Sequence, residues 1–258
     1  MKRIFKSLGL GFGLLVLHCL IGSITVDIFT KIFKLHLQQD ENVLVTLGSY
    51  STLAILYYIS LNKNKLVNEY NFKKICIKDI IYIILLGIGI DSISTIIINS
   101  LINIFPGYIE VTNKMDASTN SIISIICFVV FIPIFEEIMC RGIIFNHLKR
   151  NYSIVSAIII QALIFGLLHG NIIQSTYTFI CGIVFVLVNI YCGSIFGGII
   201  LHIIFNLFGV LYLKNLLTFN EFYSTIYLSL GVLIFAYIGF KMILNYKKHN
   251  IKNKYSKV

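Results

Sequence analysis

The stretch "SIISIICFVVFIPIFEEIMCRG", residues 121–142, decides the fold. Apart from three charged side chains near its end it is apolar, and it has the length of about 20 residues with which a helix crosses the hydrocarbon layer of a membrane. The whole chain shares this character, with 57% hydrophobic and only 12% charged residues and a mean hydropathy of +0.88. This composition excludes an ordinary soluble domain and predicts an integral membrane protein.

Apolar runs of similar length fill most of the chain, and polar connections between them are too short for a soluble domain. The predicted fold class is therefore all-α, a polytopic bundle of about eight transmembrane helices in a single membrane domain, residues 1–258, with a basic tail at 245–258. The predicted spans are 8–30, 43–61, 79–104, 121–142, 153–169, 173–192, 194–213 and 223–244.

The net charge of +10 comes from lysines and arginines that lie between the apolar runs. They precede the first run, surround the second connection, follow the fourth run and fill the tail, so the positive-inside rule places both termini in the cytoplasm and requires an even number of spans. Because these charges form no stripe on a folded surface, we expect membrane lipid and no nucleic acid as a partner. A composition rich in Lys, Asn and Ile predicts a bacterial cell membrane as the location.

The charged residues of the opening stretch need a reason, because an ionisable group at mid-membrane costs at least about 2.5 kcal/mol and usually faces the bundle interior. Glu137 and Arg141 are four residues apart on one helical face and can pair. Glu136 is rotated by about 100° from Glu137 and finds Cys140 at its own i+4 position. Pro133 removes a backbone hydrogen bond nearby and can open a polar cavity.

Two further polar positions lie at helical spacing. Phe165 and His169 end one predicted span, and His202 and Asn206 share a face of another. A lone membrane histidine is more often a helix–helix hydrogen-bonding residue. Together with Glu136, however, two imidazoles and an amide from separate helices could activate a water and stabilise an oxyanion.

These motifs, E-E-x-x-x-R at 136–141, F-x-x-x-H at 165–169 and H-x-x-x-N at 202–206, stand in an order that resembles the CPBP intramembrane proteases. This family, also called Abi, groups CAAX prenyl endopeptidases with bacterial bacteriocin-processing and immunity-associated proteins. The resemblance covers about 121–210 and implies an all-helical core whose motif residues converge on a cavity within the membrane.

The resemblance also implies roles for the motif residues. Glu136 would be the general base that activates water, assisted by His169, and Glu137 with Arg141 would fix the helix. His202 and Asn206 would bind or polarise the substrate carbonyl. Glu136, His169 and His202 are the implied ligands of a divalent metal such as zinc, which takes three protein ligands and an open position; a metal-free, glutamate-activated water is the competing account.

The predicted function is therefore an intramembrane endopeptidase whose substrate is a leader, bacteriocin, signalling or lipidated peptide. The alternative is a non-catalytic bacteriocin-immunity or membrane scaffold protein of the same fold. Other intramembrane proteases fit less well, since H-E-x-x-H is absent and Asp91 lacks the accompanying motifs of an aspartyl protease. Asp91 is therefore interpreted as a packing or cavity residue.

Simple helix geometry raises one difficulty for this convergence. At 1.5 Å per residue counted from Ser153, His169 lies about 24 Å from the inner face, deeper than Glu136 and His202. We therefore expect the boundaries of that span to differ from 153–169.

Overall fold

The computed structural model describes residues 72–213 and 220–255, together with residues 13, 16, 20–24, 27–28, 31, 43 and 45–54 of the N-terminal part. The predicted spans 8–30 and 43–61 therefore lie largely outside the described residues. The described part of the chain is helical and contains no strand. Its main elements are α3 (Ile77–Leu101), α4 (Tyr108–Ala117), α5 (Ile122–Ile126), η2 (Cys127–Phe131), α6 (Ile132–Glu137), η3 (Ile138–Phe145), α7 (Asn146–Asn151), α8 (Ile154–Leu167), α9 (Ile172–Cys192), α10 (Ile195–Leu213) and α11 (Glu221–Tyr255).

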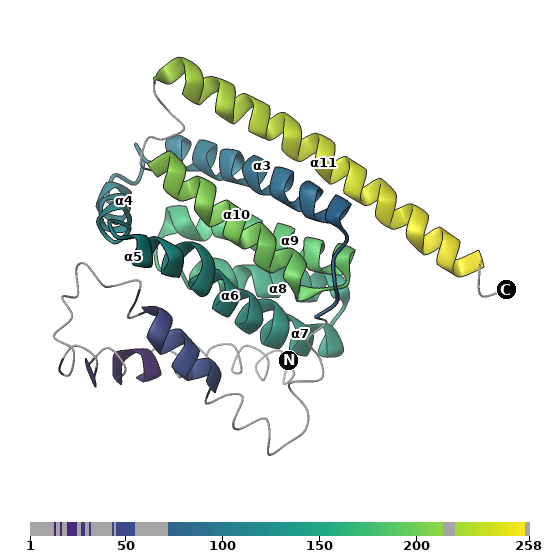
Figure 1. Cartoon of the computed structure of the whole chain (residues 1–258), viewed down its shortest axis with the longest axis horizontal. Coiled ribbons are helices and arrows are strands. Elements are labelled where there is room, and N and C mark those ends of the chain that lie inside the picture. Colours follow the sequence, from purple (N-terminus) through teal and green to yellow (C-terminus); the bar gives the residue numbers. More distant parts are fainter. Residues whose placement is uncertain are drawn as a thin grey trace.

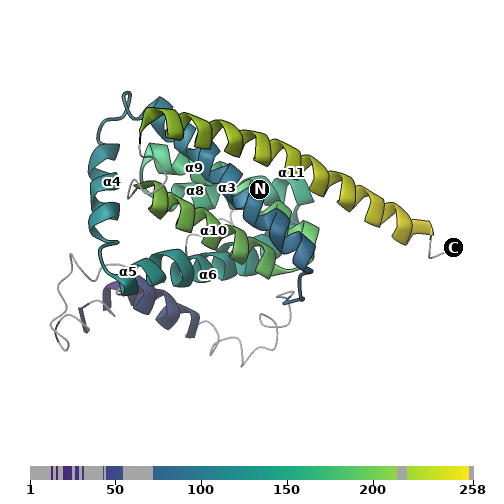
Figure 2. The same cartoon turned by 45° about the horizontal axis from the view of Figure 1, so that its top comes forward.

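Helix α10 lies at the centre of the bundle, where it packs against α3, α6 and α9 (Figure 1). Helix α8 packs along α9, and α11 packs along the outer side of α3. The C-terminal part of α11 extends beyond the rest of the bundle, and α4 stands across the opposite end (Figure 2). Because α10 is central, its polar side chains lie inside the bundle and can contact the helices around it.

Four of the described helical segments are long and apolar enough to cross a membrane: Ile77–Leu101, Ile122–Asn151, Ile172–Cys192 and Glu221–Lys247. Helices α8 and α10 are apolar but shorter. A chain with several such helices, packed on one another without strands, confirms the predicted all-α polytopic membrane bundle.

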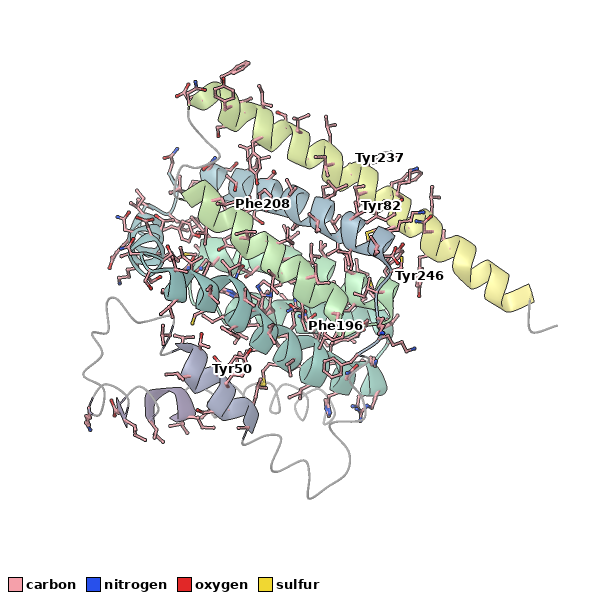
Figure 3. All side chains as sticks on the ribbon, viewed as in Figure 1. Tyr50, Tyr82, Phe196, Phe208, Tyr237 and Tyr246 are labelled. Atoms are coloured by element: carbon pink, nitrogen blue, oxygen red, sulfur yellow. The ribbon has the colours of Figure 1, made fainter. Side chains whose placement is uncertain are left out.

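The surface of the bundle is as apolar as a lipid-facing surface should be. On α11, Leu233 and Phe240 are 65% and 60% exposed. Tyr237 and Tyr246, whose side chains are labelled in Figure 3, are also exposed on this helix. Large exposed apolar side chains are unfavourable in water but are stable against lipid tails.

Helices α3 and α11 approach closely through small residues. Gly231 of α11 faces Ser92 of α3 so closely that a Cβ at this glycine would overlap the serine side chain, and Gly89 faces Phe235 in the same way. Small residues are the usual means by which membrane helices bring their backbones together, because lipid provides no hydrophobic driving force for association.

The helix from Ile122 to Asn151 departs from α geometry on both sides of Pro133. The segments Cys127–Phe131 and Ile138–Phe145 are π-helical, and the N–H of Ile132 donates to the carbonyl of Cys127. Because proline has no N–H, the carbonyl of Phe128 is left without the next donor in this π pattern. The predicted disturbance by Pro133 is thus a wider helix with a carbonyl that accepts no hydrogen bond from its own helix.

Candidate active site

Neighbouring positions of this helix, Glu136 and Glu137, occupy opposite environments. The side chain of Glu136 is 28% exposed and lines a cavity of about 430 Å³. The side chain of Glu137 is 0% exposed and points away from that cavity into the helix bundle. The rotation of about 100° between consecutive helical residues accounts for this separation.

Glu137 forms a buried ion pair with Arg141. Its Oε1 lies 2.8 Å from Nη1 of Arg141, whose side chain is only 1% exposed. The guanidinium also lies 4.3 Å above the ring of Phe165 and 5.2 Å from that of Phe185, and it donates to the carbonyl of Gly182 at 3.4 Å. The opposite charge and the two aromatic faces offset the cost of removing the pair from water.

His202 lies between the two glutamates. Its Nδ1 is 3.1 Å from Oε1 of Glu137, and its Nε2 is 3.5 Å from Oε2 of Glu136. A carboxylate only accepts hydrogen bonds, so Nδ1 donates to Glu137, and a neutral imidazole then carries its lone pair on Nε2. The buried ion pair therefore orients this histidine toward Glu136.

His169 lies just after the end of α8 and lines the same cavity. The helix ends at Leu167 after 14 residues, or about 21 Å, which is too little to cross the membrane. His169 follows this end, and its Nδ1 lies 2.9 Å from the carbonyl of Phe165. Helix α8 begins and ends within two residues of the predicted span 153–169, so the expected change of boundaries is not found. His169 nevertheless lines the cavity together with Glu136 and His202.

The ring of Phe165 connects the charged and imidazole groups. It packs edge to face against His169 at a centroid distance of 5.1 Å and against His202 at 5.9 Å, while Arg141 covers it. Phe165 is 2% exposed. The phenylalanine of F-x-x-x-H therefore fixes the positions of both histidines.

Asn206 lines the cavity one helical turn after His202. Its Nδ2 donates to the carbonyl of Phe128 at 3.0 Å, the carbonyl that Pro133 and the π-helical turn leave without a helical donor. The amide thus ties α10 to the helix that carries the glutamates. One of its two N–H groups is used in this contact, and the other has no acceptor among the described residues.

The cavity brings four of the six predicted residues together, Glu136, His169, His202 and Asn206, while Glu137 and Arg141 lie behind them. Aromatic rings, including those of Phe128, Phe165 and Phe205, form much of its wall. Within the described residues, no group of three or more His, Cys, Asp and Glu side chains is close enough to hold a metal ion.

Three supporting residues were missed by sequence reasoning. Phe185, 0% exposed, packs on His202 at a centroid distance of 4.7 Å. A Cβ added at Gly198 would lie 2.5 Å from Oε2 of Glu137 and 2.7 Å from both terminal atoms of Asn189. Of these three residues only Asn189 could have been singled out from the sequence, because it places a polar amide in an apolar run.

Comparison with known families places the site in context. Residues 118–208 of the chain match the family model described as Rce1-like, the type II CAAX prenyl endopeptidase Rce1-like proteins. A search of curated proteins and a search of solved structures each gave no match. The predicted resemblance to the CPBP proteases is confirmed over this segment, and the spanning helices indicate a multi-pass membrane protein.

Proposed function

We propose that the protein is an intramembrane endopeptidase that hydrolyses a peptide bond in a membrane-associated or hydrophobic peptide. The observation that carries this proposal is the position of Glu136 beside His202 at the wall of a cavity inside a membrane bundle, where Oε2 of the glutamate lies 3.5 Å from Nε2 of the histidine. The name of the matching family, a prenyl endopeptidase, supports the same reaction class.

Glu136 acts as the general base. It takes a proton from a water molecule beside its carboxylate, and the resulting hydroxide oxygen attacks the carbon of the scissile carbonyl. The tetrahedral intermediate then collapses: the C–N bond breaks, and the proton held by Glu136 passes to the leaving amine. One water is consumed, and a carboxylic acid and an amine are released, between which a proton then passes to give a carboxylate and an ammonium.

The imidazoles and the amide assist this reaction. Nε2 of His202, held toward Glu136 by the contact of Nδ1 with Glu137, accepts a hydrogen bond from the attacking water. His169, whose Nδ1 donates to Phe165, presents its own Nε2 to the cavity in the same tautomer. The second N–H of Asn206 is a donor for the oxygen that becomes negative in the intermediate.

A divalent metal remains a separate proposal. Glu136, His169 and His202 would be its ligands, and the metal would lower the pKa of a bound water. Since these groups do not form a three-ligand set within the described residues, the steps above use protein groups alone. Hydrolysis that is lost on treatment with a chelator and restored by zinc would favour the metal account.

The substrate is a peptide that presents a hydrophobic or lipid-attached segment to the bundle. Apolar side chains form most of the cavity wall, and the helices around it face lipid. The candidates are a leader, bacteriocin, signalling or lipidated peptide that enters laterally or from the cytoplasm. A soluble hydrophilic peptide cleaved equally well would contradict this choice.

The experiment compares peptide termini in membranes of cells that carry the wild type, Glu136→Gln or no copy. Glu110→Gln is the matched control, because this glutamate is 75% exposed in an ion pair on α4. New termini should appear with the wild type and the control alone. If Glu136→Gln accumulates normally and yields the same termini and phenotype as the wild type, the hydrolase proposal fails in favour of an immunity or scaffold role.

A further inference from the structure

A second carboxylate lines the cavity at a distance from Glu136. Asp91, in the middle of α3, is 3% exposed and belongs to the cavity wall. Its Oδ2 accepts a hydrogen bond of 2.6 Å from the hydroxyl of Tyr227 on α11. Asp91 is therefore held in a fixed position, and the mechanism above makes no use of it.

The other oxygen of this carboxylate is open to the cavity. Oδ1 borders Gly209 of α10, where an added Cβ would lie 3.5 Å away. Within the described residues no hydrogen-bond donor contacts Oδ1, since the hydrogen bond of Tyr227 goes to Oδ2. Oδ1 is also absent from the fully buried polar atoms that lack a partner. An acceptor in this position suits a donor that arrives with a ligand.

The charges of the cavity wall are unbalanced. Its acidic residues are Glu136 and Asp91, and the residues that line it include no lysine or arginine. The nearby Arg141 is already paired with Glu137. Because an uncompensated carboxylate in a low-dielectric site is costly, a cation is the ligand that such a wall favours.

Further polar residues of α3 line the cavity beside Asp91. Thr95 and Asn99 follow at successive intervals of four residues along α3, and both line the cavity. Asp91 and Thr95 are buried, whereas Asn99 is exposed. This stripe offers hydrogen bonds to a peptide that lies along α3, with Asp91 at its inner end.

The spacing along α10 gives the distance between Asp91 and the proposed place of cleavage. Gly209, which borders Asp91, is seven residues from His202, or about 10 Å along a helix. An extended peptide advances about 3.3 Å per residue. A group bound at Asp91 is therefore about three residues from a peptide bond held at His202.

We propose that Asp91 binds a cationic group of the substrate, a lysine or arginine side chain or an amino terminus, about three residues from the cleaved bond. This inference rests on the proposed function and adds a specificity determinant to it. Hydrogen bonds to charged groups contribute enough for the preference to reach about tenfold or more.

The test uses hydrophobic peptides that differ only in lysine or norleucine at successive positions on either side of the cleaved bond. We measure kcat/KM with the full-length protein in lipid nanodiscs, and Kd with the Glu136→Gln variant, which holds the peptide without cutting it. Lysine should be preferred by about tenfold at the third residue on one side and less at its neighbours.

Asp91→Asn should abolish this preference, because the amide can still accept from Tyr227 but carries no charge. Asp79→Asn is the matched control: Asp79 lies on the same helix and accepts from a tyrosine hydroxyl, that of Tyr191 at 2.8 Å, but it does not line the cavity. This control should keep the preference.

The outcomes separate the two proposals. Cleavage without any preference for lysine, or a preference that survives Asp91→Asn, overturns the Asp91 subsite and leaves the hydrolase intact. No cleavage of any peptide by the wild type overturns the proposed function itself. The comparison of the two peptides on the wild type needs no variant, so the absence of a preference overturns the subsite even if Asp91→Asn fails to accumulate.

Discussion

Two sides of one helix turn, the cavity side with Glu136 and the buried side with Glu137, differ in almost every physical respect. Glu136 borders the cavity beside an imidazole nitrogen, and among the described residues no lysine or arginine lines that cavity. Glu137 is fully buried and shares one oxygen between Arg141 and His202. Adjacent, identical residues can therefore have separate tasks when a helix turns one of them toward a cavity and the other toward the core.

The difference teaches how a charged site is maintained inside a membrane bundle. The buried pair, with the aromatic rings of Phe165 and Phe185, forms a neutral support that orients His202. The cavity side can then present one carboxylate that is free to exchange a proton. Four predictions test this division between the two sides.

The largest effect is expected at Glu136. Glu136→Gln removes the general base but keeps the size of the side chain, so the rate of peptide cleavage should fall by about 10³-fold or more. The thermal midpoint in detergent should stay within a few degrees of the wild type. A rate that remains within tenfold of the wild type would show that this side of the helix is not the chemical side.

On the buried side, breaking the ion pair should reduce stability. Glu137→Gln leaves Arg141 buried without its counter-charge, and losing one partner of such a pair costs about 3–5 kcal/mol. Unfolding of the purified protein in mixed micelles measures this effect. The double variant Glu137→Gln, Arg141→Met should recover much of the loss, because no uncompensated charge remains.

The double variant also sharpens the comparison. It should fold but cleave slowly, because Nδ1 of His202 loses its carboxylate acceptor and the ring is no longer held in one tautomer. Full activity in this variant would mean that the pair has no influence on the cavity side.

A smaller effect is expected from a methyl group inserted behind Glu137. Gly198→Ala places a Cβ 2.5 Å from Oε2 of Glu137, and such overpacking typically costs about 1–3 kcal/mol. Displacing this carboxylate should also move His202 and lower kcat more than it raises KM. Gly239→Ala is the control, since nothing lies within 4 Å of its added Cβ; equal behaviour of the two variants would contradict the close contact.

The smallest effect is expected at the exposed ion pair of α4. The hydrogen bond from Lys114, 2.8 Å from Glu110, lowers the pKa of Glu110 below its usual value. A carboxyl with a lowered pKa stabilises the fold above its unfolded pKa, and this contribution is lost as the pH falls through the folded pKa.

Because both side chains are solvated, Glu110→Gln should change neither the midpoint at pH 7 nor its decline on acidification measurably. Thermal unfolding between pH 3 and pH 7 checks this expectation. A clear shift would show that solvated and buried pairs differ less than proposed.

Much of this arrangement follows from the sequence. Apolar runs of membrane-spanning length predicted the helices, and the i, i+4 spacing predicted that Glu137 and Arg141 share a face. The motif order predicted that residues from separate helices meet at one cavity. The first two features depend on local periodicity and on the cost of charge in lipid, which a single sequence contains, whereas the convergence on one cavity was implied by the resemblance to the CPBP proteases.

Other features depend on geometry that the residue types do not specify. The contact of Asn206 with Phe128 requires the π-helical turn before Pro133, and the place of His169 requires that α8 end at Leu167. The exposure of Asp91 to the same cavity depends on how α3 packs against α10. Tertiary packing decided each of these, so spacing along the chain could not predict them.

The most direct test of the central claim is cleavage in water enriched in ¹⁸O by the purified protein in nanodiscs, followed by mass analysis of the new carboxyl terminus. We predict that the wild type introduces one ¹⁸O atom into this carboxylate and that Glu136→Gln forms no product. Product formed by Glu136→Gln at the wild-type rate would contradict the role of Glu136 as the base that activates water.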